Sequence, residues 1–302
     1  MRKMVTAVRD DKDRSSRPEY SRLRNACQLT LAATLDPIAA PLTYPGAAPG
    51  GPAVLVTEIN VLDVRPSRTR PLGEWRVRLG EEEDGALDEV LLEYEAVPVA
   101  GRIPVLAVGS NAAPAQLRRK LATSDAGTAV PITAVRVNGL SVGVSAHVSN
   151  AGYVPATPVP DPSSKNLLMW VTWLAQDQLL TIDKTEPNYD RIRVPRSCSI
   201  RLTSGQVVSG CWLYVSRHGY LIGPSGEPRK LIDQAGLISS LLAEFPGLAE
   251  LAGASPKEWV SRVRDKQIRD DIRDLFRSAG IARSSGQDVQ GSGVFRECPL
   301  LS

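Results

Sequence analysis

The sequence predicts an α+β fold, a small mixed β-barrel flanked by helices and followed by a helical C-terminal extension. Many short strand patterns follow one another from residue 53 onward with few helices between them, unlike the regular alternation of a doubly wound sheet. Beyond Pro224 the apolar spacing becomes helical. The 302 residues are 42% hydrophobic and 23% charged, which is typical of globular chains and excludes a wholly disordered or collagen-like one.

The first 52 residues are predicted to be a basic, largely flexible segment and linker. Residues 1–25 contain eight Lys and Arg against four Asp and Glu, and few apolar groups. Residues 26–35 could form a short helix. The stretch 36–53 is rich in proline and glycine and has the composition of a linker. The formal net charge of +3 therefore belongs to the tail, and the rest of the chain is close to neutral.

Residues 53–225 are predicted to form the barrel domain. Strands are expected where β-branched and apolar residues cluster, and helices where apolar residues recur at helical spacing. Proline and glycine runs predict the loops. The expected strands are 53–64, 104–108, 129–137, 140–148, 167–174, 189–195, 197–202, 206–216 and 220–222, with helices at 86–95, from Pro114, and at 176–186, and a proline-rich loop at 154–162.

Residues 226–302 are predicted to form the helical extension. Helices are expected at 234–245, after the capping box that begins at Ser255, and at 266–279, followed by a loose tail. We expect this extension to cap the barrel or to contact a partner, including a second copy of the chain.

The first candidate functional element is the turn Gly109-Ser110-Asn111, which follows the short apolar strand 104–108 and precedes a helix. A turn of this kind leaves backbone N–H groups unpaired, and such groups bind an oxyanion or a carboxylate. An ordinary strand-to-helix turn has the same pattern.

The second candidate is Glu186, at the end of the helix that Pro187 stops. Asp183 lies three residues earlier on the same helical face. A carboxylate beside aromatic side chains can be partly desolvated, which would suit a general base at neutral pH. A solvated acid at a helix end is the alternative.

In this order, the motifs PVLAVGSN and D-x-x-E resemble those of the gamma-glutamylcyclotransferase-like superfamily. The resemblance covers about residues 103–232. It implies a small barrel in which Gly109, Ser110 and Asn111 hold a γ-glutamyl group and Glu186 is the general acid–base, with Val108 and Tyr189 also lining the substrate site. It implies the release of 5-oxoproline and an amine from a γ-glutamyl-type amide, with no cofactor and no metal.

The sequence departs from this family at two aromatic positions. Val108 stands where the family loop begins with tyrosine, and Pro228 falls where a later tyrosine is expected. Two functions therefore stay open. One is a cyclotransferase-like enzyme, which Glu186 favours, and the other is a non-catalytic small-molecule-binding or scaffold protein that keeps the barrel.

Other chemistries have weaker signals. Cys198 or Cys211 could pair with His147 or His218 as a thiol nucleophile, although strand cysteines are usually small apolar residues. A zinc site is disfavoured because two histidines without nearby ligands do not give its spacing.

We also expect no nucleic-acid partner, because no positive cluster marks a folded face; Arg118, Arg119 and Lys120 are interpreted as a solvated basic face. No apolar run reaches the length of a membrane helix. The four cysteines are widely spaced, and we expect a cytoplasmic protein with free thiols.

Overall fold

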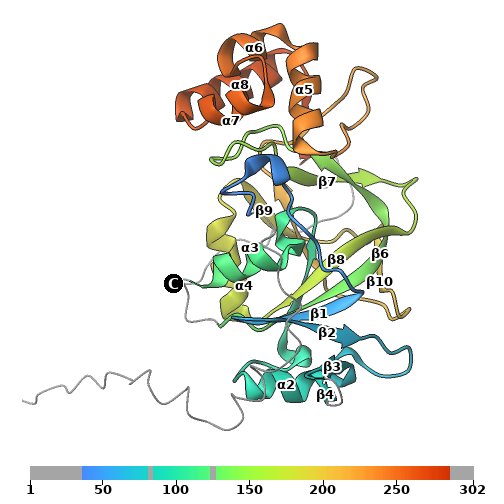
Figure 1. The fold of residues 1–302 in the computed structure, drawn as a ribbon. Coiled ribbons are helices and arrows are strands. Elements are labelled where there is room, and N and C mark those ends of the chain that lie inside the picture. The colour runs from blue at the N-terminus through green and yellow to red at the C-terminus, as the bar shows by residue number, and fades with distance from the viewer. Residues whose placement is uncertain (1–35, 81–83, 123–126, 286–302) are drawn as a thin grey trace, which may run out of the picture.

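The computed structural model describes residues 36–80, 84–122 and 127–285, which form an α+β fold around one large mixed sheet (Figure 1). The strands of this sheet are β1 (Ala53–Val56), β2 (Val61–Arg65), β3 (Arg76–Arg78), β4 (Asp84–Ala86), β5 (Ile103–Ala107), β6 (Val130–Val144), β7 (Ala156–Asp161), β8 (Leu167–Leu174), β9 (Tyr189–Arg193), β10 (Ser199–Leu202) and β11 (Trp212–Ser216). The α-helices are α2 (Leu87–Glu93), α3 (Pro114–Leu121), α4 (Gln176–Thr185), α5 (Gln234–Glu244), α6 (Pro246–Ala252), α7 (Pro256–Arg262) and α8 (Lys266–Ser278). A separate ribbon pairs β12 (Tyr220–Leu221) with β13 (Ala282–Arg283).

Strand β6 is the spine of the sheet. Its first half pairs with β1 on one edge and with β8 on the other, and further along β10 and β7 take those places. The change from β8 to β7 occurs at Gly139, whose φ of +85° is a left-handed conformation that favours glycine. A Cβ there would also lie 3.1 Å from the Ser197 carbonyl oxygen. One long strand therefore replaces the two strands predicted at 129–137 and 140–148.

The sheet is mixed, as predicted, but the described strands do not close into a barrel. Their order runs β4-β3-β2-β1-β6-β8-β5-β11-β9, and no described pairing joins β4 to β9. The first three strands of this order are short, and α2 lies beside β3 and β4 at the lower end of the view in Figure 1. Closure needs pairing between strands far apart in the sequence, which strand patterns do not specify.

The predicted helices that fall within the described residues are confirmed, whereas several strand and loop boundaries are wrong, among them the strand expected at 206–216, of which only β11 forms. The strand expected over 53–64 is the hairpin β1–β2, which turns at residues 57–60. The proline-rich stretch 154–162, expected to be a loop, contains β7. Its described strand partner is β6 alone, and Pro158 and Pro160 are tolerated at such an edge because they have no N–H to pair. The helix expected at 26–35, the tail 286–302, Cys27 and Cys298 lie outside the described residues.

The segment that begins at Asp36 folds against the sheet domain. It contains a short 3₁₀ helix, η2 (Pro41–Thr43), and its Tyr44 is only 5% exposed. The Asp36 carboxylate accepts hydrogen bonds from Gln116 and pairs with Arg119 at 3.1 Å, both on α3. Part of the stretch with linker composition is thus held against the structure.

The C-terminal helices pack on the end of the sheet near β7 and are coloured orange to red in Figure 1. Their shared core joins Val144, Val148 and Val154 to fully buried Trp259 and Phe276. None of the described helices alone is long and apolar enough to cross a membrane. Helices α5 and α6 reach that composition only together, and they meet at an angle of 117°.

Arg102 connects the elements that carry the candidate site. Its buried guanidinium donates to the carbonyl oxygens of Val97, Ala129 and Trp173 at 2.7–3.0 Å, and to the Gln178 side chain at the start of α4 at 3.3 Å. We expect Arg102→Met to lower the free energy of unfolding by about 3 kcal/mol, because buried carbonyls lose their donors. Urea unfolding measures this change.

The control is Arg136→Met, which removes an exposed arginine bonded to the Asn166 carbonyl. It should change stability by less than about 0.5 kcal/mol. Equal effects of the two substitutions would contradict the role assigned to Arg102.

Candidate functional site

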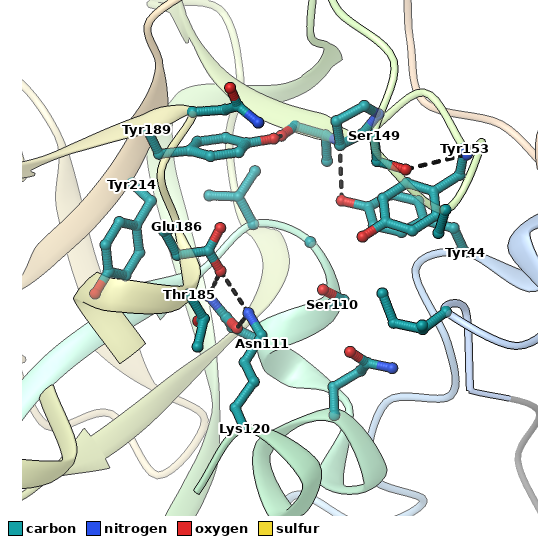
Figure 2. Close-up of a pocket in the computed structure, with 18 of the residues that line it drawn as sticks. Tyr44, Ser110, Asn111, Lys120, Ser149, Tyr153, Thr185, Glu186, Tyr189 and Tyr214 are labelled. Carbon is teal, nitrogen blue, oxygen red and sulfur yellow. Dashed lines mark hydrogen bonds and ion pairs between the residues drawn. The ribbon is translucent and has the colours of Figure 1, made fainter. Parts of the chain in front are cut away.

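The candidate site is a cavity of about 250 Å³ between the ends of β5, β6 and α4, with the segment around Tyr44 on its far side (Figure 2). All six site residues expected from the sequence line this one cavity: Val108, Gly109, Ser110, Asn111, Glu186 and Tyr189. Its wall also holds side chains that the sequence did not indicate, among them Tyr44, Lys120, His147, Tyr153 and Tyr214.

The loop Gly109–Asn111 lies at the end of β5 because that strand is held on both edges. It pairs antiparallel with β8 and parallel with β11. The 3₁₀ turn η5 (Ser110–Ala112) follows at once, and Pro114 then begins α3. The loop is therefore fixed at a strand end, with the Asn111 side chain turned toward α4.

Glu186 is the C-cap residue of α4, and its backbone N–H donates to the Asp183 carbonyl. Its Oε1 accepts from Asn111 Nδ2 at 3.0 Å and from Lys120 Nζ at 2.5 Å. The side chain is 14% exposed. Among the described residues Oε2 has no hydrogen-bond partner, so one oxygen is fixed and the other is open to a ligand (Figure 2).

Lys120 corrects the expectation of a solvated basic face. Its side chain is 7% exposed and pairs with Glu186, while Nζ also donates to Asn111 Oδ1 at 2.7 Å. On α3 it shares the buried face with Leu117 and Leu121. The helical spacing of Lys120 from Leu117 and Leu121 indicates that it lies on the buried face, although a buried lysine is uncommon.

Asp183, the other acid of the D-x-x-E motif, does not line the cavity. It forms a two-bond ion pair with Arg191 at 2.9 and 3.2 Å and accepts from the Tyr214 hydroxyl at 2.7 Å. These contacts hold α4 against β9 and β11. Asp183 therefore positions the helix, and Glu186 alone of the two faces the ligand space.

Tyr44 brings a phenol to the Gly109–Asn111 loop from the N-terminal segment. Its hydroxyl accepts a hydrogen bond from the Ala156 N–H at 2.9 Å. A Cβ at position 109 would overlap this hydroxyl, so the approach requires glycine. A ring and a hydroxyl are thus present beside the loop although position 108 is valine.

Further tyrosines surround the carboxylate. The Tyr153 ring stacks on Tyr44 with centroids 4.2 Å apart, and the Tyr189 hydroxyl donates to the Ala156 carbonyl at 2.9 Å. Burial raises the pKa of Tyr153 to about 12 and that of Tyr189 well above its ordinary value. These phenols therefore stay protonated and neutral at physiological pH, and each can donate a hydrogen bond.

Neither cysteine–histidine pairing is assembled. The Cys211 thiol lies against the Trp212 carbonyl, and burial raises its pKa to about 12. The two histidine rings instead pack on each other, with the centroids of His147 and His218 4.6 Å apart. Within the described ranges, no group of three or more His, Cys, Asp or Glu side chains could hold a metal ion.

His147 predicts a pH dependence of stability. Burial, then the nearby His218 ring and Arg273 guanidinium, lowers the pKa of His147 from 6.5 to about 3. Below pH 6.5 the unfolded chain therefore takes up a proton that the folded chain refuses, and stability is lost as pH falls. We expect the free energy of unfolding to drop by about 1–2 kcal/mol between pH 7 and pH 5 from this group.

Urea unfolding across this pH range measures the effect, and His147→Phe should flatten the profile. His218, whose pKa is also lowered, adds the same slope to both proteins. An equally steep profile in the variant would contradict the assignment to His147.

No family model matches the chain, and no curated protein matches it. Solved structures that match include an uncharacterised human protein, at 15% identity and a TM-score of 0.32, covering 57% of this chain and 99% of that one. A gamma-glutamyl cyclotransferase matches at 14% identity and a TM-score of 0.31, with the same coverage. An Arabidopsis thaliana protein matches at 15% identity and a TM-score of 0.31, covering 50% and 92% of the two chains.

A member of the family that the two motifs resemble is thus among the structural neighbours of this chain. At these identities and TM-scores the likenesses say nothing about the function of this chain.

Proposed function

We propose that the chain is a gamma-glutamylcyclotransferase-like enzyme that cleaves a γ-glutamyl-type amide, releasing 5-oxoproline and an amine. The observation that carries this proposal is the Glu186 carboxylate, whose Oε1 is held by Asn111 and Lys120 while Oε2 is open to the cavity. A carboxylate with one fixed and one open oxygen can exchange a proton with a bound ligand without moving.

In the proposed reaction the nucleophile is the α-amino group of the substrate. Glu186 takes a proton from the α-ammonium, and the freed nitrogen attacks the γ-carbonyl carbon. A new C–N bond closes the five-membered ring, and the original amide C–N bond breaks. Two protons leave the α-nitrogen during ring closure, and Glu186 transfers both in turn to the departing nitrogen, which leaves as an ammonium ion. The proton count balances with no other reactant.

Negative charge develops on the γ-carbonyl oxygen as the ring closes. Donors for it are the N–H groups of the Gly109–Asn111 loop and the Tyr44 hydroxyl. This phenol accepts a hydrogen bond from the Ala156 N–H, which polarises it, and its own proton has no acceptor among the described residues. Tyr44 would therefore supply the hydroxyl that Val108 cannot.

The alternative is a non-catalytic binding protein, and one observation favours it. Lys120 already pairs with Glu186, with 2.5 Å between Nζ and Oε1. A ligand carboxylate or ammonium could be held by this pair without any reaction. The two functions differ in product formation, because the binding protein retains its ligand unchanged.

The test is the release of 5-oxoproline from a panel of γ-glutamyl amines and γ-glutamyl dipeptides, followed by mass spectrometry. The enzyme is expected to convert at least one member of the panel and to release the matching amine in equal amount. Binding of a panel member without conversion would establish the alternative instead.

A further inference from the structure

His147 lines the cavity but has no part in the reaction as described so far. It follows the end of β6, is 5% exposed, and lies edge-on to the Tyr189 ring with centroids 5.9 Å apart. Its Nδ1 is 2.6 Å from the Ser145 hydroxyl oxygen, whereas its Nε2 has no partner among the described residues. Nε2 is therefore the ring nitrogen available to a ligand.

A buried chain of hydrogen bonds determines which ring nitrogen carries the proton. The His218 backbone N–H donates to Ser216 Oγ at 3.1 Å, and the Ser145 hydroxyl donates to the same oxygen at 2.7 Å. A hydroxyl has a single proton. Because Ser145 uses that proton on Ser216, the bond between Ser145 and His147 must be donated by Nδ1–H.

We propose that His147 is fixed as the Nδ1–H tautomer and that its Nε2 lone pair accepts a hydrogen bond from an N–H group of the ligand. The naming of that ligand as a γ-glutamyl amide rests on the proposed function. The tautomer itself is a property of the free protein. The proposed tautomer and the proposed function can therefore be tested, and can fail, separately.

The surroundings keep this acceptor uncharged. Within the described part of the chain, the rings and charged groups that act on His147 are the His218 ring, the Tyr189 ring and the Arg273 guanidinium on α8, none of which is an anion. A neutral imidazole differs from Glu186 because it can accept an N–H without placing a second negative charge in the cavity. A buried acceptor of this kind discriminates against ligands that lack the N–H, since it would be left unpaired.

The tautomer can be read directly by long-range ¹H–¹⁵N NMR on the full chain labelled with ¹⁵N-histidine. The sequence contains only two histidines, so His218→Gln assigns the remaining signals to His147. The expected spectrum shows a pyrrole-like Nδ1 and a pyridine-like Nε2. Ser145→Ala should shift the population toward Nε2–H, because Nδ1–H loses its acceptor.

Recognition is tested by comparing KM with kcat in His147→Phe and His147→Gln for whichever panel amide the wild type converts. Loss of the acceptor should raise KM about tenfold in the phenylalanine variant, equivalent to about 1.4 kcal/mol, with kcat less affected. The glutamine variant, which offers a carbonyl acceptor, should recover part of this loss.

An Nε2–H tautomer or a doubly protonated ring in the wild type overturns the inference whatever the panel shows. An unchanged KM in His147→Phe overturns the role in recognition. If the wild type converts no panel member, the proposed function fails, and the free-protein spectrum alone decides whether His147 presents the lone pair.

Discussion

Glu186→Gln is expected to lower kcat about 10³-fold while the fold is retained, because the amide cannot accept a proton at the open oxygen position. The substitution keeps the shape of the side chain and leaves an oxygen for Asn111 and Lys120, which otherwise hold Oε1. The measurement is the single-turnover rate of 5-oxoproline formation, with circular dichroism as a check on folding.

The matched control is Asp183→Asn, one helical turn earlier. Asp183 is paired with Arg191 and Tyr214 and does not line the cavity. Its replacement should lower the free energy of unfolding and should lower kcat far less than Glu186→Gln does. A Glu186→Gln protein as active as the wild type would remove Glu186 from the mechanism.

Gly109→Ala has the second large expected effect. A Cβ at position 109 would overlap the Tyr44 hydroxyl oxygen and lie 3.3 Å from its Cζ and 3.4 Å from the Ala156 Cβ. Overpacking of this kind costs about 1–3 kcal/mol. We expect a loss of stability in that range, and a loss of turnover because the donors on the loop and the phenol are pushed apart. Urea unfolding and 5-oxoproline release measure the two effects.

A double-mutant cycle with Tyr44→Phe identifies the cause. The single change Tyr44→Phe removes the acceptor of the Ala156 N–H and should destabilise by about 1–3 kcal/mol. Removing the hydroxyl also removes the main clash of Gly109→Ala. The double variant should therefore be less destabilised than the two single variants added together. Additive losses would mean that Tyr44 does not contact Gly109 in solution.

The loop and the catalytic candidate could be found in the sequence because their signals are local. Gly109-Ser110-Asn111 lies directly between an apolar strand and a proline-initiated helix. Glu186 is fixed at a helix end because Pro187 follows it. Local backbone constraints of this kind place a residue at the end of a strand or helix. In the structure the loop after β5 and the end of α4 meet, where Asn111 contacts Glu186.

The residues that contact the loop and Glu186 are predicted only in part by the sequence. Lys120 lies on the apolar face of α3, but a lysine is predicted to be solvent-exposed unless a carboxylate is known to pair with it, as Glu186 does here. Tyr44 lies in a stretch of linker composition, far from the loop in sequence. Its contact with Gly109 depends on tertiary packing, which no local pattern encodes.

The open sheet has the same explanation. Short strands were predicted along 53–222, but whether their ends close depends on pairings such as β5 with β11, between strands about a hundred residues apart. The sequence does not predict the edge strand β7, because Pro158 and Pro160 are typical of loops. Strand positions were thus largely predictable, whereas their order and closure were not.

In the proposed mechanism the α-amino group of the substrate, and not water, attacks the γ-carbonyl beside Glu186. The direct measurement is turnover of a γ-glutamyl amide in ¹⁸O-enriched water, with mass spectrometry of the product. The expected product is 5-oxoproline that contains no ¹⁸O from the solvent, with the amine released in equal amount. Glutamate carrying ¹⁸O in its γ-carboxyl group would show attack by water and would contradict the proposed mechanism.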